Sequence, residues 1–190
     1  LPSPLSLDAD NLYLWRFAPR RLEAEPLRDA ILAVAGNLNT KRGGPGFDLF
    51  EPNNNYVKVY EPRHEFGPGE LRRMVYQAKP RMQLDDVFGA FDCPDAGQAA
   101  PKRTRSTTPL QALNLLNSPF LLAEADVFAA RVINEAGSDV EPQVRQAFRI
   151  AFGREADNEE AADAARLVKS HGLPALCRAL FNANEFLYVF

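Results

Sequence analysis

From Pro109 onward, apolar residues recur at the spacing of an α-helix, and this periodicity constrains the fold more than any other feature of the sequence. Apolar residues fall at i, i+4, i+7 and i+11 from Leu121, and comparable stripes begin at Val144 and Leu176. An amphipathic helix in a globular protein is stabilised mainly by burying its apolar stripe against another element. The pattern therefore predicts several helices that pack against one another.

Helix-breaking residues divide this part of the chain into about five helices. The breaks lie at Ser118-Pro119, Gly137-Ser138, Gly153-Arg154 and Gly172. Asp157 and Glu160 have the spacing of a capping box, which marks a helix start. Another helix ends at Gly36, and Pro26 has to lie in its first turn or kink it. The predicted fold is mainly α, a compact helical bundle of about five to seven helices, with residues 108–190 as the main bundle.

Residues 39–77 are predicted to form a small irregular or β-containing insertion. Glycine and proline punctuate it at 43–46 and again at 67–69. Residues 56–60, YVKVY, alternate like a strand, and residues 71–77 are predicted as its partner or as a short helix. Before the first helix, residues 12–17, LYLWRF, are predicted as a short strand or a buried entry segment.

Length and composition indicate one domain, residues 1–190, and exclude several classes of protein. A chain of 190 residues with 46% hydrophobic residues can bury a real core. Its first residue is Leu1 rather than Met, so we expect the chain to be a piece of a larger protein. A net charge of -3 argues against a nucleic-acid-binding domain. No apolar run reaches the roughly 20 residues that a membrane span requires.

The cysteines and histidines form no motif for zinc, covalent haem or a metalloprotease, so the sequence predicts no metal and no cofactor within this chain. Cys93 and Cys177 are the only cysteines, and we expect free buried thiols rather than a disulfide. His64 and His171 are expected to be ordinary side chains, because no ordering of serine, histidine and aspartate indicates a triad.

A cationic loop that includes Lys102 runs directly into a marked helix start at Pro109. A threonine at the N-cap and proline at the first helical position are both typical of helix N-termini. Cations held beside the positive end of a helix dipole suit an anion such as sulfate, phosphate or carboxylate. The alternative is a solvated loop whose arginines pair with nearby acids. The predicted ligand-binding residues are Arg103, Arg105, Thr107 and Thr108.

A cluster of carboxylates precedes this loop and allows three interpretations. Such acids could bind calcium, or could supply a catalytic pair for glycoside hydrolysis. In the third interpretation, Asp92 or Asp95 forms an ion pair with Arg16, Arg20 or Arg21 and holds the loop on the first helix. Asp92 is kept as a catalytic candidate. The members of the cluster are Asp85, Asp86, Asp92 and Asp95.

On the last predicted helix, Arg178, Asn182 and Glu185 lie at i, i+4 and i+7, so they share one face. We expect this face to join helices through polar residues of the central helix, and Glu185 is the second catalytic candidate. The candidate partners are Gln111, Asn114 and Asn117.

Several aromatic residues could stack on sugar rings if they were exposed, although such residues are more often part of a core. They are Tyr13, Trp15, Tyr56 and Tyr60.

Four ordered blocks carry a resemblance to a known family: LWRFAPRRLEAEPLRD at 14–29, FDCPD at 91–95, RSTTPLQALNLLNSPF at 105–120 and NANEFLYV at 182–189. The chain resembles the C-terminal part of the planctomycete domain-of-unknown-function family 1553. The resemblance implies a partner unknown domain and a cytochrome-c-like domain as neighbours, in large secreted or periplasmic proteins. It implies an extracytoplasmic location and no particular activity.

The lack of a recognisable nucleophile, metal or cofactor constellation favours a non-catalytic interaction or ligand-binding module of a large extracytoplasmic protein. The expected partners are other domains of the parent protein and an anionic small molecule or polysaccharide. Two alternatives stay open. One is an enzyme, or part of one, that acts on an anionic or carbohydrate substrate, and the other is a docking domain for a cytochrome-like electron-transfer domain.

Overall fold

Helices dominate the computed structural model, which describes residues 3–52, 56, 60–63, 66–81, 86–94 and 96–189. The longer helices are α2 (Ala24–Ala35), α4 (Pro109–Asn117), α5 (Pro119–Ala136), α6 (Val140–Phe152), α7 (Asn158–His171) and α8 (Leu173–Phe181). The short ones are α1 (Pro4–Leu7), α3 (Asp86–Gly89), α9 (Asn184–Leu187) and the 3-10 turn η1 (Met74–Tyr76). The prediction of a mainly α fold is confirmed.

The helix boundaries follow the local signals in the sequence. Gly36 ends α2 in the left-handed conformation, with φ of 89°, and Pro26 lies in the first turn of that helix. Thr108 is the N-cap of α4 and Pro109 its first residue. At the start of α7, the Asp157 carboxylate accepts hydrogen bonds from the backbone N–H groups of residues 159 and 160 at 2.9 and 2.8 Å. These two N–H groups would otherwise lack a hydrogen-bond partner inside the helix.

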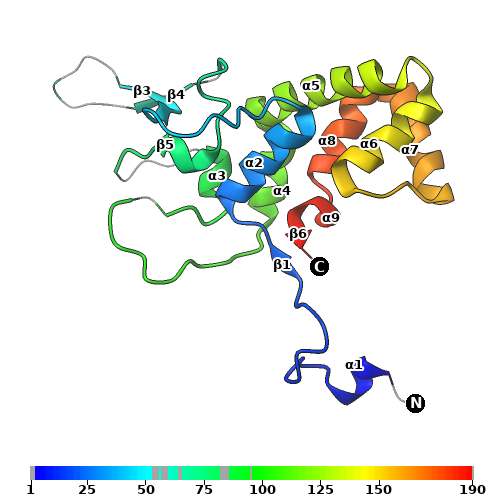
Figure 1. Ribbon diagram of the computed structural model, residues 1–190, viewed down its shortest axis with the longest axis horizontal. Helices are drawn as coiled ribbons and strands as arrows, with labels where there is room; N and C mark the ends of the chain where they lie inside the picture. Colours follow the sequence, from blue (N-terminus) through cyan, green and yellow to red (C-terminus); the bar gives the residue numbers. More distant parts are fainter. Residues whose placement is uncertain are drawn as a thin grey trace.

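The helices α5, α6, α7 and α8 pack side by side, and α2 also packs against α5 (Figure 1). Three two-stranded pairings complete the described structure. β1 (Arg20–Arg21) runs antiparallel to β6 (Tyr188–Val189), β2 (Phe47–Asp48) runs parallel to β5 (Gln77–Ala78), and β3 (Phe50–Pro52) runs antiparallel to β4 (Tyr60–Pro62). The last two pairings and η1 lie in or next to the insertion predicted at 39–77. Of the segment 56–60, residues 57–59 lie outside the described residues, and Tyr60 begins β4.

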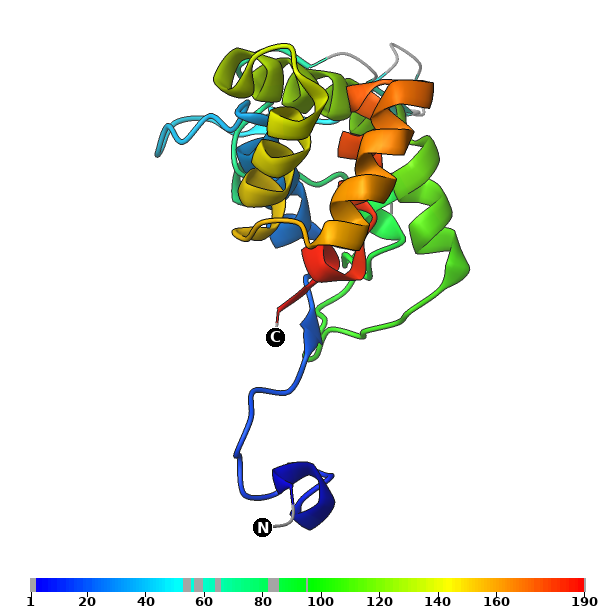
Figure 2. The ribbon, with the colours of Figure 1, turned by 90° about the vertical axis from the view of Figure 1, so that its right-hand side faces the viewer.

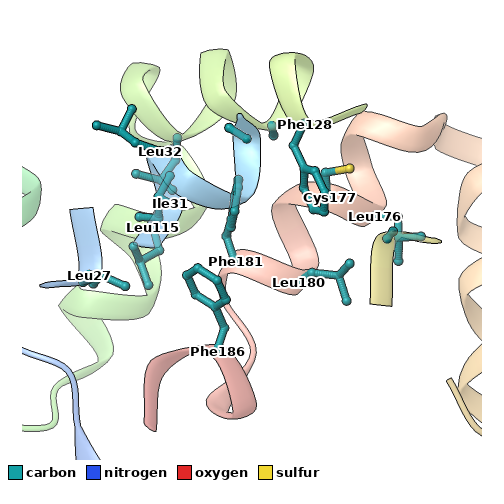
Figure 3. Packing of buried hydrophobic residues seen from close by; sticks show 14 of the residues in the cluster. Leu27, Ile31, Leu32, Leu115, Phe128, Leu176, Cys177, Leu180, Phe181 and Phe186 are labelled. Atoms are coloured by element: carbon teal, nitrogen blue, oxygen red, sulfur yellow. The ribbon is translucent and has the colours of Figure 1, made fainter. Parts of the chain in front are cut away.

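The core is formed where α2, α4, α5 and α8 meet (Figure 3). Phe181 of α8 lies at its centre, fully buried, with its ring centroid 5.6 Å from that of Phe128 on α5 and 5.4 Å from that of Phe186 on α9. Leu27 and Ile31 on α2 are also fully buried. One apolar cluster therefore joins helices from both ends of the sequence.

Two buried arginines attach the irregular insertion to this core. Arg28 on α2 is fully buried and donates to the backbone carbonyl oxygens of Arg72 and Glu70, both at 2.8 Å. Arg72 in turn donates to the carbonyl oxygens of residues 45, 41 and 43 at 2.8, 3.0 and 2.6 Å. These bonds satisfy carbonyl groups of a segment that has little regular structure of its own.

The segment 12–17 differs from its prediction, because it is neither a strand nor buried. Tyr13 and Leu14 are 85% and 82% exposed. We call residues 3–19 the arm, because they extend away from the helical body in both views (Figures 1 and 2). The alternating aromatic pattern indicated burial, but no part of the chain that the structure describes covers these side chains.

Replacing Phe181 with alanine is expected to lower the free energy of unfolding by about 3–5 kcal/mol, because the change leaves a cavity beneath two aromatic neighbours. Urea denaturation followed by circular dichroism measures this quantity. Leu110→Ala, at an exposed position on α4, is the matched control and should change the free energy by no more than about 0.5 kcal/mol. Equal effects of the two substitutions would contradict the assignment of the core.

Candidate functional site

The cationic loop lies in the long connection between α3 and α4 and is fixed to the start of α2. Arg103 donates from both terminal nitrogens to Glu25, Nη1 to Oε2 at 2.6 Å and Nη2 to Oε1 at 2.9 Å. Its Nη1 also donates to Oε2 of Glu23 at 3.0 Å. Arg105 forms a looser ion pair with Glu23, at 3.7 Å. Arg103 therefore holds the loop to the start of α2, whereas the guanidinium group of Arg105 is less tightly paired.

A lysine and a cysteine extend this network into the body of the protein. Lys79 Nζ lies 3.0 Å from Glu25 Oε1 and 3.0 Å from the sulfur of Cys93. Burial alone would raise the pKa of Glu25, but the hydrogen bonds from Arg103 and Lys79 outweigh it and lower the pKa to about 2. Burial raises the pKa of the Cys93 thiol despite the neighbouring ammonium group. Cys93 is consequently a protonated, buried thiol at neutral pH, as is typical of a structural cysteine.

The loop borders a surface cavity of about 830 Å³ that is lined by three cationic side chains and one acidic one. Its lining residues are Glu23, Lys102, Arg103, Thr104 and Arg105. We call this space the cationic cavity. An excess of positive charge in a concave surface favours an anion, because the surrounding protein focuses the field.

The structure brings Arg103 and Arg105 together but separates them from the two threonines of the predicted site. Thr107 Oγ1 lies 3.4 Å from the hydroxyl of Tyr188, and Thr108 forms a capping box with Gln111 on α4. Neither threonine is among the described residues that line the cationic cavity. The first turn of α4 is therefore occupied by its own cap.

Asp92 holds the loop in place, as one of the three interpretations of the acidic cluster anticipated. Its Oδ2 accepts from Arg21 Nη2 at 2.6 Å and from the Ser106 backbone N–H at 2.8 Å, while its Oδ1 accepts from Ser106 Oγ at 2.9 Å. Burial would raise the pKa of Asp92, but the bonds from Ser106 and the charge of Arg21 lower it. Of the three arginines predicted as partners, the structure has Arg21, which lies in β1 rather than on the first helix. Asp85, Asp95 and the side chain of Asp86 lie outside the described residues.

Glu185 belongs to a different ion-pair network. Its two carboxylate oxygens accept from Arg154 Nε and Nη2 at 2.7 and 2.6 Å. Arg154 also forms a two-bond pair with Glu160 and so joins α9 to the start of α7. The prediction of one continuous helical face from Arg178 to Glu185 is wrong, because α8 ends at Phe181 and α9 begins at Asn184. Asp92 and Glu185, the two catalytic candidates, share no partner in the described structure.

The arm is the feature that the sequence did not identify as a surface. All of its residues are described, and the large apolar side chains that it exposes are Leu5, Leu7, Leu12, Tyr13, Leu14, Trp15 and Phe17. Its backbone is nevertheless fixed by a local hydrogen-bond network. The buried carboxylate of Asp8 accepts from the backbone N–H groups of residues 12 and 13, both at 2.8 Å. Apolar residues in a run of this length are ordinarily covered.

The remaining candidate features are metal ligands, membrane-spanning helices, cysteines and histidines. Within the described part of the chain, no group of three His, Cys, Asp or Glu side chains is arranged to hold a metal ion. The helices described here include none that is both long and apolar enough to cross a membrane. Cys93 and Cys177 are both free and buried, as expected. His171 Nδ1 lies 2.7 Å from Ser170 Oγ, and His64 lies outside the described residues.

Fold and site together define a mainly α domain that carries a cationic cavity and an exposed apolar arm. The chain belongs to the family PSD1, described as a protein of unknown function (DUF1553), whose profile matches residues 2–168. The expected family membership is confirmed. No curated protein and no solved structure matches this chain.

Glu25 is expected to make stability depend on pH in the acidic range. Its pKa falls from an ordinary 4.5 to about 2 on folding, so its contribution is present above pH 4.5 and is lost as the pH falls towards 2. Glu25→Gln should lower the free energy of unfolding near neutral pH by about 2 kcal/mol and make stability depend less on pH between those values. Urea unfolding at several pH values tests this.

The exposed pair of Glu141 with Arg145 supplies the control for that measurement. Glu141→Gln should leave both stability and its pH dependence nearly unchanged, because an exposed ion pair contributes little. If Glu25→Gln retained the pH dependence of the natural chain, Glu25 would not be the group responsible.

Proposed function

We propose that this chain is a non-catalytic interaction module that docks through its arm onto a neighbouring domain of a larger extracytoplasmic protein. One observation carries the proposal: the arm exposes a run of leucine and aromatic side chains in a fixed conformation. Aromatic residues dominate the energetics of protein interfaces because they bury a large area. The location and the neighbouring domain rest on the family resemblance, with which the exposed arm is consistent.

Hydrogen bonds within the arm set the direction in which these side chains point. Besides the two bonds to Asp8, the indole N–H of Trp15 donates to the Asp8 carbonyl at 2.8 Å. Asn11 Nδ2 donates to the Arg16 carbonyl at 2.8 Å, and Arg16 N donates back to Asn11 Oδ1 at 3.1 Å. The residues between them form a closed turn whose apolar side chains face outward. A binding element already in its bound shape loses less conformational entropy on association.

The base of the arm is anchored to the body where β1 pairs with β6. Arg20 is opposite Val189 and Arg21 is opposite Tyr188 in this pairing. The ion pair of Arg21 with Asp92 fixes the same point from the side of the long loop. The base of the arm is therefore held to the helical body by a strand pairing and by an ion pair.

Site-specific photo-crosslinking in the complete natural protein tests the docking proposal. A photoreactive phenylalanine analogue replaces Tyr13, and mass spectrometry identifies the crosslinked peptide. We expect a peptide of the same polypeptide from outside residues 1–190, and one from a cytochrome-c-like domain would assign that domain as the partner. Asp8→Ala should reduce the yield, because it releases the turn.

Leu113 on α4 provides the matched control, since it is also an exposed apolar position but lies away from the arm. The analogue at Leu113 should give no comparable product. A crosslink only to a second copy of the arm, an equal yield at Leu113, or no crosslink at Tyr13 would overturn the proposal.

The cationic cavity supports a second proposed function, the binding of an anionic small molecule or polysaccharide. Arg103 and Arg105 line it, and Lys102 adds a third cation beside a single carboxylate. Thr107 and Thr108 belong to the same proposed site only as residues that fix the following helix. Asp92 and Glu185 lie in separate ion-pair networks, and this arrangement favours binding over catalysis.

Thermal unfolding with sulfate, phosphate and a sulfated oligosaccharide tests this second function. A ligand at about a hundred times its dissociation constant should stabilise the protein by about 2.7 kcal/mol, which raises the melting temperature by roughly 5–10 °C. Lys102→Ala combined with Arg105→Ala should abolish the shift without releasing the anchor at Arg103. Lys169→Ala, on α7, should retain it. A shift that survives the double substitution would contradict the site.

A further inference from the structure

We propose that the glycine-rich loop of the insertion forms a second binding site, for a small hydroxylated carboxylate of the sugar-acid class. The site is a cavity of about 460 Å³ on the face of the insertion, separate from the cationic cavity. We call it the glycine cavity. Its lining includes glycines 43, 44, 46 and 69 and the charged residues Lys41, Asp48 and Arg72. Arg63 and Glu70 also line it, and their charges offset each other in an ion pair of 3.6 Å.

The first argument is the buried charge of Arg72 in its wall. Arg72 is only 6% exposed, and its guanidinium group bonds to backbone carbonyl oxygens and stacks at 4.0 Å on the ring of Tyr76. Among the described residues, no carboxylate lies within ion-pair distance of Arg72, and its Nε has no acceptor. A buried charge is costly unless an opposite charge compensates it. An anionic group in the adjoining cavity would supply that charge.

The second argument is the polarity of the cavity rim. Lys41 is exposed, and its ammonium group has no carboxylate partner in the described structure, so it adds to the positive charge beside Arg72. Asp48, at the end of β2, is exposed, and its carboxylate likewise has no described ion-pair partner. A carboxylate accepts hydrogen bonds from hydroxyl groups but repels a second anion. The rim therefore suits a ligand with a negative group at one end and hydroxyl groups at the other.

The third argument is the open space in front of the glycines. Gly43 and Gly44 have φ of 70° and 83°, and a Cβ atom at Gly43, Gly44 or Gly69 would meet no atom within 4 Å. The loop thus presents bare backbone to the cavity, and the N–H of Gly43 is held by the Tyr76 hydroxyl at 2.9 Å. Glycine allows a ligand to approach the main chain closely. A cavity of this size accommodates one sugar ring, at the lower end of the range for small-molecule sites.

Nuclear magnetic resonance with ¹⁵N-labelled protein tests the proposal, with glucuronate, glucose and acetate as probes. Glucuronate should cause saturable shifts of the amide signals of Gly43, Gly44, Gly46 and Gly69. Glucose lacks the charge and acetate lacks the hydroxyl groups, so the dissociation constant of each should be higher than that of glucuronate by a factor of about ten or more.

Three variants localise the binding. Gly69→Leu adds a bulky side chain at a lining position without removing a hydrogen bond of Arg72. It should abolish the shifts, while the other amide signals remain those of the folded protein. Lys41→Ala should weaken the binding of glucuronate more than the binding of glucose. Arg105→Ala changes the cationic cavity alone and should have no effect. The proposal is overturned if glucuronate causes no saturable shifts, if they survive Gly69→Leu, or if acetate binds equally well.

Discussion

The hydrogen bonds of Arg28 connect the regular and irregular parts of this protein. Its side chain leaves α2, is fully buried, and ends on the carbonyl oxygens of residues 70 and 72. Arg72 continues the chain of contacts to the carbonyl oxygens of the glycine-rich loop. A guanidinium group suits this role, because its planar set of donors can satisfy several acceptors in fixed directions. The insertion therefore keeps its shape without an extended sheet, and Arg72 also places a positive charge in the wall of the glycine cavity.

A comparable use of charge fixes the long connection before α4. Arg103 reaches Glu25 at the start of α2, and Asp92 reaches Arg21 at the base of the arm. Both pairs join residues that are far apart in sequence and partly shielded from solvent, where ion pairs are stronger than on an open surface. Residues predicted to bind a ligand or to catalyse thus have structural partners first. In the cationic loop, the cations that are least engaged by such partners among the described residues are Lys102 and Arg105, which has only the looser pair with Glu23.

The sequence predicted the features that depend on neighbouring residues. The structure confirms the helix ends predicted from Pro26, Gly36 and the pair Asp157 and Glu160, because caps are set within a few residues. At the start of α4 the sequence left Thr107 and Thr108 as alternative N-caps, and the structure has Thr108. It could not choose among Arg16, Arg20 and Arg21 as partner of Asp92, since that choice depends on how β1 pairs with β6. The sequence analysis also missed the break between α8 and α9. Because of this break, Glu185 does not continue the face that begins at Arg178 and pairs with Arg154 instead. The exposure of residues 12–17 was hidden, because an apolar pattern is the same whether its cover belongs to the chain or to another domain.

The turn around Asp8 has a consequence for the speed of association. Asn11 and Leu14 have φ of 56° and 54°, a conformation that L-residues rarely adopt, and the bonds to Asp8 and Asn11 hold the turn closed around them. Because the turn is already formed in the free protein, an encounter does not have to wait for the segment to fold. The proposed docking of the arm should therefore proceed at the rate at which two rigid surfaces meet, and the lifetime of the complex should set its affinity.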